Sequence, residues 1–206
     1  MKRTAIAVAL LASAQMVSAG EMNGINYNQV GIGFGTITQD INISGVGVDG
    51  SFSGAGISGT VLVAENILLG FSSQSASGTL KAAGISLDTD ISAVSFGVGY
   101  RYPVASGIDI VPILQHISSK ADIELLGSYK VNTTVFGMLL NGRLTDSIQA
   151  GVSYVTDFDN DEYGTTFGVN GLFKVNQTFG IGLDYGVSSN DISDSTSVII
   201  SANYLF

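Results

Sequence analysis

The chain has 206 residues, of which 45% are apolar and only 12% are charged, and it contains 27 glycines and no cysteine. A soluble domain is usually about one quarter charged, so this composition argues against an ordinary cytosolic protein. The apolar content excludes disorder, and the absence of cysteine excludes disulfides and thiolate metal sites. The formal net charge of −9 argues against a nucleic-acid partner, because the surface would repel phosphate backbones.

Residues 1–19 predict a secretory signal peptide. Lys2 and Arg3 precede an uncharged, mostly apolar run that reaches Val17, and small residues follow it. A basic start, an apolar stretch and small residues before a cleavage point are typical of such signals, and the run is too short to span a bilayer. Cleavage after Ala19 would leave residues 20–206 as one domain with a net charge of −11.

Beyond the signal, bulky apolar residues alternate with small or polar ones. The run from Phe179 to Gly186, FGIGLDYG, is one example, and similar runs occur at 30–35, 94–100, 148–154 and 198–206. This period of two predicts β-strands, and no apolar run of eighteen residues remains for a helical span.

The small-residue face of these strands favours a membrane barrel over a soluble sandwich. An exposed face would carry charged side chains, whereas glycine and serine fit a narrow lumen whose apolar outer face meets lipid. Backbone groups in lipid must be paired internally, so the sheet has to close. The fold class is therefore all-β, a closed antiparallel up-and-down transmembrane β-barrel.

Ten strands are expected, at 25–38, 51–64, 67–80, 85–101, 109–121, 129–143, 148–157, 164–174, 178–187 and 195–206. Mostly short turns link them at one end, and more polar links, including one around Asp40–Asp49, lie at the other end. An even strand number places both chain ends on the periplasmic side. Eight strands remain the alternative, because 51–64 is rich in Ser and Gly and Pro112 interrupts the fifth strand.

The C-terminal sequence VIISANYLF ends on Phe206, with Tyr204 and further apolar residues at alternate positions before it. This pattern resembles the C-terminal signal of bacterial outer-membrane barrels, which the barrel-assembly machinery reads. The chain as a whole resembles the small barrels of the OmpA, OmpX and opacity-protein type. The resemblance implies an outer-membrane location, with lipids and lipopolysaccharide as surroundings, but no single subfamily.

His116 and Ser118 share one strand face. Their spacing resembles the His-x-Ser arrangement of outer-membrane lipid A deacylases, which implies His116 as general base and Ser118 as nucleophile, with Glu124 the nearest acid. That family has Asn after the serine, where this chain has Ser119. We favour an interfacial histidine without a catalytic role.

No metal site and no cofactor are expected. A single histidine excludes a multi-histidine site. Asp157, Asp159 and Asp161 begin like a calcium loop, but Glu162 replaces the required Gly and Gly168 the terminal Glu. We interpret this segment as a solvated hairpin tip.

Three charged residues fall on small-residue faces and are therefore expected to face the lumen: Arg101, Arg143 and Asp184. They would form ion pairs that plug a narrow barrel, or line an aqueous path. The tyrosines fall near strand ends, where they are expected in interfacial girdles; they are Tyr27, Tyr100, Tyr102, Tyr129, Tyr154, Tyr163, Tyr185 and Tyr204.

The sequence thus favours a non-enzymatic integral outer-membrane barrel with a structural or small-solute permeability role. A narrow passive channel is the first alternative, and lipid A deacylation by His116 and Ser118 is the second.

Overall fold

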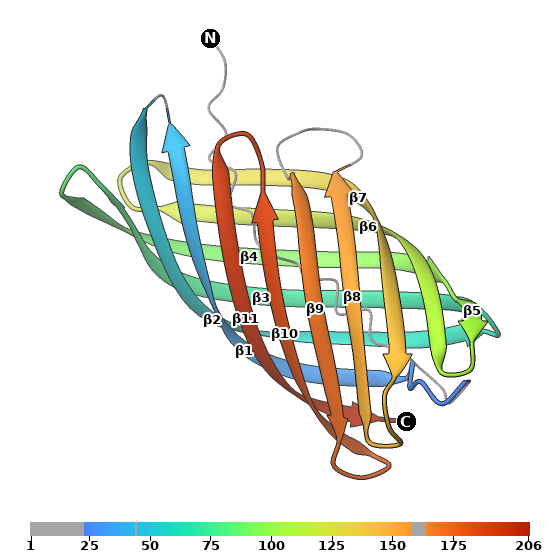
Figure 1. Cartoon of the computed structure of the whole chain (residues 1–206). Coiled ribbons are helices and arrows are strands. Elements are labelled where there is room, and N and C mark those ends of the chain that lie inside the picture. The colour runs from blue at the N-terminus through green and yellow to red at the C-terminus, as the bar shows by residue number, and fades with distance from the viewer. Residues whose placement is uncertain (1–22, 44, 158–163) are drawn as a thin grey trace.

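The computed structural model describes residues 23–206 except 44 and 158–163, and these form a closed antiparallel barrel (Figure 1). The strands are β1 (Gln29–Ile43), β2 (Val46–Ala64), β3 (Ile67–Ala82), β4 (Ile85–Tyr100), β5 (Tyr102–Ala105), β6 (Ile108–Ile123), β7 (Gly127–Arg143), β8 (Ile148–Asp157), β9 (Thr165–Lys174), β10 (Phe179–Ser189) and β11 (Ser193–Leu205). No helix in this part of the chain is long and apolar enough to cross a membrane.

Ten of these strands make the wall, and the prediction of ten rather than eight is confirmed. Each wall strand pairs with the next wall strand along the chain, which for β4 is β6. The pairing of β1 with β11 joins the first strand to the last and closes the ring. The fifth wall strand is β6, because the short β5 lies outside the ring as a hairpin arm on the start of β6. Figure 1 shows β5 and the C-terminus at the same end of the barrel, which we call the β5 end.

Pro112 is accommodated where the ladder beside β6 is already broken. The pairing of β4 with β6 stops at Gly99 opposite Ile113, and that of β5 with β6 begins at Tyr102 opposite Ile110. Pro112 lies in this gap, where a residue without an N–H group is tolerated.

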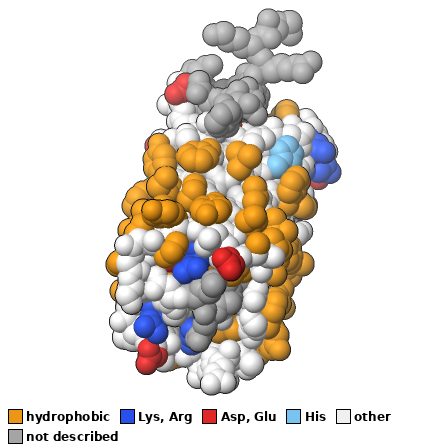
Figure 2. Space-filling view, turned by 90° about the vertical axis from the view of Figure 1, so that its right-hand side faces the viewer, with side chains coloured by type: hydrophobic (Ala, Val, Ile, Leu, Met, Phe, Trp, Pro, Cys, Tyr) orange, Lys and Arg blue, Asp and Glu red, His pale blue; other side chains and the backbone are white. Residues whose placement is uncertain are grey.

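The outer face carries a continuous apolar belt. Phe34, Phe71, Phe96, Leu114 and Ile200 are each at least two-fifths exposed, and Figure 2 shows apolar side chains gathered on the visible face of the wall with polar surface beyond them. So much exposed apolar surface is stable only against lipid. The alternation in the sequence therefore places apolar residues on the outside, as predicted.

The strands differ in length in a way that the sequence did not indicate. The wall strands β8, β9 and β10 have 10 or 11 residues, which suffices to cross a bilayer, whereas β2, β3, β4, β6 and β7 have 16 to 19. The additional residues of the longer strands lie at the end of the barrel opposite β5. The loop expected around Asp40–Asp49 is accordingly wrong, because β1 continues to Ile43 and β2 resumes at Val46.

The barrel interior contains two apolar clusters in addition to glycine and serine. The inner face of β6 supplies Val111, Ile113 and Ile117 to the cluster near the β5 end, and Ala121 and Ile123 to the cluster near the opposite end. The second cluster also holds Ile41, Phe52, Leu80 and Ile91. The apolar residues of this chain therefore form two internal packing layers as well as the outer belt.

Glycines on the inner faces of β1 and β2 let neighbouring strands approach closely. A Cβ atom added at Gly54 would overlap the carbonyl oxygen of Ser75 and lie 2.6 Å from the Cα atom of Ala76, both backbone atoms of β3. At Gly47, on the same strand, an added Cβ atom would meet nothing within 4 Å.

We therefore expect Gly54→Ala to lower the free energy of unfolding by about 1–3 kcal/mol, since the β2–β3 backbone contact cannot give way without strain. Gly47→Ala is the matched control and should leave stability unchanged or slightly higher, because alanine restricts the unfolded chain. Urea titration of the refolded barrel, followed by heat-modifiable migration in gels, measures both. Equal stabilities of the two variants would contradict the packing argument.

Candidate functional site

Residues 23–28 do not belong to the wall but fold into the β5 end of the barrel. Ile25 and Tyr27 are almost fully buried, at 1% and 0% exposure, although they precede the first strand. Both pack in the apolar cluster that contains Ile113 and Leu139. Two expectations are thus corrected: the first strand begins at Gln29 rather than 25, and Tyr27 lies in the lumen rather than in an interfacial girdle.

Apolar packing is the reason for this insertion. Ile25 and Tyr27 cover the inner apolar faces of β6 and β7 at the β5 end, including Val111 and Val135. Without them, that surface would face water inside the barrel, at a cost of about 25 cal/mol for each Å². We call residues 23–28 the plug segment.

Asp109 joins the plug segment to the wall. Its carboxylate is fully buried and accepts hydrogen bonds from Arg101 Nε at 2.6 Å and Nη2 at 3.3 Å, from the Tyr27 hydroxyl, and from Asn23 Nδ2 at 3.2 Å. Arg101 is 4% exposed, and its guanidinium carbon lies 5.2 Å from the centre of the Tyr27 ring. A buried charge is tolerated only when it is paired and hydrogen-bonded, and this carboxylate meets both conditions.

Tyr27 serves here as a neutral donor. Its burial, followed by its hydrogen bond to Asp109, raises the pKa of the phenol above its usual value. The hydroxyl therefore keeps its proton and continues to donate to the carboxylate across the physiological pH range.

Main-chain contacts hold the plug segment at both of its ends. At its start, Asn23 Nδ2 donates to the Ala105 carbonyl at 2.7 Å, and Asn23 Oδ1 accepts from the Gly107 N–H at 2.8 Å. At its end, Asn28 Oδ1 accepts from the Leu62 N–H at 3.3 Å. The segment therefore bridges the turn before β6 and the end of β2.

The three charged residues expected in the lumen have different surroundings. Arg101 is buried against Asp109, whereas Arg143 is 38% exposed and lies 3.4 Å from Asp146 in the turn after β7. Asp184 is 8% exposed on the inner face of β10. Asp109, the residue that organises the site, was not singled out from the sequence, although its position between Ile108 and Ile110 on an alternating strand placed it on the inner face.

The structure does not assemble the hypothetical deacylase triad. His116 Nδ1 lies 3.3 Å from Thr134 Oγ1, and its ring packs 5.7 Å from that of Phe96. No hydrogen bond joins His116 to Ser118 among the described residues. Glu124 instead accepts from the Asp88 N–H at 3.4 Å, in the turn after β6.

Other expectations fall partly outside the described residues. The signal peptide and its cleavage site do so, as do Asp159, Asp161 and Glu162 of the acidic loop. Asp157, at the end of β8, accepts from Thr133 Oγ1 at 2.7 Å. Within the described ranges, no group of three or more His, Cys, Asp or Glu side chains could hold a metal ion.

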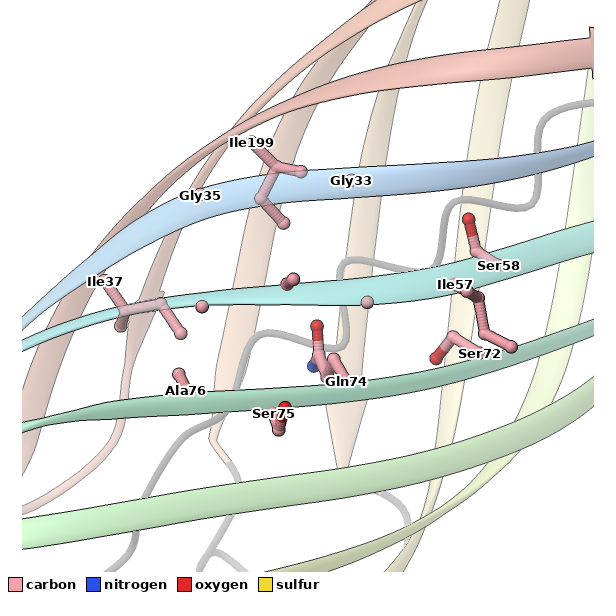
Figure 3. Close-up of a pocket in the computed structure, with 13 residues that line it drawn as sticks. Gly33, Gly35, Ile37, Ile57, Ser58, Ser72, Gln74, Ser75, Ala76 and Ile199 are labelled. Atoms are coloured by element: carbon pink, nitrogen blue, oxygen red, sulfur yellow. The ribbon is translucent and has the colours of Figure 1, made fainter.

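A small cavity of about 60 Å³ lies inside the wall at β1, β2 and β3 (Figure 3). Its lining includes Gly33, Gly35, Gln74 and Ile199, all on inner strand faces. This volume corresponds to about two water molecules in the liquid. The cavity therefore marks where glycine leaves the lumen incompletely filled, and we assign no solute to it.

The comparisons with known proteins show the fold. The chain is similar in structure to the translocator domain of the autotransporter NalP from Neisseria meningitidis, with 13% identity, a TM-score of 0.54, and coverage of 87% of this chain and 88% of that one. It is also similar to the β-domain of the Bordetella autotransporter BrkA, with 12% identity, a TM-score of 0.54, and coverage of 86% and 99%. A third similar structure is the outer-membrane protease OmpT from Escherichia coli, with 8% identity, a TM-score of 0.52, and coverage of 87% of this chain and 97% of that one. No family model and no curated protein sequence matches the chain, which has the fold of the outer-membrane β-barrels.

The central contact of the site can be tested by removing one charge. Asp109→Asn leaves Arg101 buried without a counter-ion, so we expect the free energy of unfolding to fall by about 3–5 kcal/mol. Arg101→Gln together with Asp109→Asn removes both charges and should recover part of that loss. Urea unfolding of the refolded barrels measures both variants, and a double variant no more stable than the single one would contradict an ion pair.

Proposed function

We propose that this chain is a non-enzymatic structural barrel of the Gram-negative outer membrane, with its lumen closed at the periplasmic end by its own plug segment. The observation that carries the proposal is the buried Asp109 carboxylate, which takes its hydrogen bonds from the wall and from the plug segment at once. A carboxylate lining an open aqueous path would be hydrated instead.

The lining of the lumen supports closure rather than conduction. Side chains that line a water-filled pore are polar and exposed to the pore. Here the inner face of β6 presents Val111, Ile113 and Ile117, each 1% exposed, and they pack against Tyr27 in one cluster. A hydrated solute would have to displace this packing in order to pass.

The outer-membrane location is supported by three features that agree with one another: the apolar belt, the barrel fold and the predicted signal peptide. We infer that lipids and lipopolysaccharide surround the belt. We also infer that the barrel-assembly machinery recognises β11 and the residue that follows it, since Tyr204 and Phe206 are both exposed, with their rings 6.0 Å apart. β5 and the C-terminus would then face the periplasm.

The absence of enzymatic activity is part of the same proposal. It is supported by the different hydrogen-bond partners of His116 and Glu124. His116 contacts the Thr134 hydroxyl, and Glu124 accepts a hydrogen bond from the Asp88 N–H. An acyl-transfer site needs its nucleophile and its base within hydrogen-bond reach.

Conductance across planar lipid bilayers tests the proposal. We expect the purified full-length mature barrel to give no discrete current steps under conditions in which a reconstituted porin does, because the plug segment and the inner apolar face exclude water. Reproducible steps from the folded, heat-modifiable form would contradict the closed barrel and would favour the narrow channel instead.

A further inference from the structure

Two lysines lie directly opposite each other on the outer surface, near the end of the barrel opposite β5. Lys120 of β6 and Lys130 of β7 are register partners and both are exposed. Partners on one face of a sheet have Cβ atoms about 5 Å apart, and like charges there are destabilising. The facing of these two ammonium groups is therefore unfavourable for the stability of the sheet.

Within the described part of the chain, an acidic side chain forms an ion pair with only one of the two lysines. Asp122 lies 2.6 Å from Lys120 Nζ and also accepts from the Ser128 hydroxyl. Lys130 has no ion-pair partner within the described ranges. Among the described residues, one ammonium group thus remains available for an anion that approaches from outside the barrel.

The position of the pair relative to the apolar belt suggests what that anion is. Along β6 and β7 from the lysine pair toward the β5 end, the outward-facing register pairs are Ser118 with Asn132, His116 with Thr134, and Leu114 with Phe136. The last of these pairs belongs to the apolar belt. Figure 2 shows the single histidine beside basic side chains at the margin of the apolar belt.

Distances along the strand agree with this position. Four residues from His116 to Lys120 cover about 13 Å, and a strand tilt of about 40° reduces this to about 10 Å of height. A lysine side chain can extend downward over apolar surface while its ammonium group stays in the polar layer. The ammonium group of Lys130 can therefore reach the headgroup layer, which is about 5–8 Å thick.

The remaining outer surface at this end is acidic, which makes the lysine pair distinctive. Asp40 lies opposite both Asp49 and Asp194, and the third lysine at this end, Lys81, lies opposite Asp49. Lys81 thus has a carboxylate directly across from it in the register, whereas Lys120 and Lys130 face each other.

We propose that Lys120 and Lys130 bind a phosphate group of a phosphorylated glycolipid in the outer leaflet. Lys130 would donate to one phosphate oxygen, and Lys120, which has three N–H donors, would donate to a second one while keeping its contact with Asp122. Ser118 and Asn132 would supply further hydrogen bonds in the row below, and the acyl chains would lie along Leu114 and Phe136. The assignment rests on the proposed function for its orientation, which directs this end of the barrel outward.

The experiment measures binding of diphosphoryl lipid A to the refolded full-length mature barrel in neutral detergent. We expect K120Q/K130Q to lose affinity by at least about fivefold, the contribution of Lys130 alone, because Asp122 already neutralises Lys120. K81Q removes one lysine at the same end of the barrel and should lose less than about twofold, since Lys81 faces a carboxylate in the register rather than a second lysine. Unchanged binding by K120Q/K130Q, or an equal loss in K81Q, would overturn the site.

Stability without lipid provides a second readout that a purely structural role would not give. K130Q removes the facing charge and keeps the Lys120–Asp122 ion pair, so the lipid-free K130Q barrel should be as stable as the parent or more stable, while lipid A should raise the unfolding temperature of the parent more than that of K130Q. If K130Q is instead destabilised without lipid, Lys130 is structural and the site is overturned.

Inorganic phosphate separates the possible sources of the phosphate group. At the concentration of lipid A used, it should not compete, because it lacks acyl chains to contact Leu114 and Phe136; effective competition would overturn a lipid ligand. These measurements are made in detergent and do not depend on conductance. A barrel that conducts ions but binds lipid A through the pair would refute the closed lumen alone.

Discussion

Closure of the backbone hydrogen-bond ladder is the constraint on which the rest of this structure depends. Strands in lipid have no water to satisfy a free edge, so β4 must meet β6 and β1 must meet β11. Once the ring is closed, the alternation of side chains determines what faces lipid and what faces the lumen. The outer belt, the two inner clusters and the buried ion pair all follow from that assignment of faces.

A closed ring of ten strands creates an interior that has to be filled. Glycines at positions such as Gly54 bring strands together on one side, and apolar residues of β6 and β7 fill the other. The plug segment completes this packing at the β5 end. The same apolar burial that stabilises a soluble core thus holds the plug segment against the wall, and the buried Arg101–Asp109 ion pair lies at that contact.

The sequence predicted the wall well because its period of two is local information. Eight of the ten expected segments fall on the wall strands with small shifts at their ends. The exceptions are the first, which starts four residues late and runs on to Ile43, and the second, which starts five residues early at Val46. The plug segment could not be predicted, because Ile25 and Tyr27 alternate like strand residues and only the shape of the finished lumen draws them inside. Pairings such as Asp109 with Tyr27, or Lys120 with Lys130, depend on register between strands, which one sequence does not specify.

The central claim is that residues 23–28 are a folded part of the barrel interior, and amide hydrogen exchange tests it most directly. If the plug segment is packed as described, the amides of Ile25 to Asn28 in the refolded mature barrel should exchange as slowly as those of the wall strands, with protection lost in a Tyr27→Ala variant. Exchange of these amides at the rate of an unstructured peptide, in a barrel whose strands are fully protected, would contradict the account.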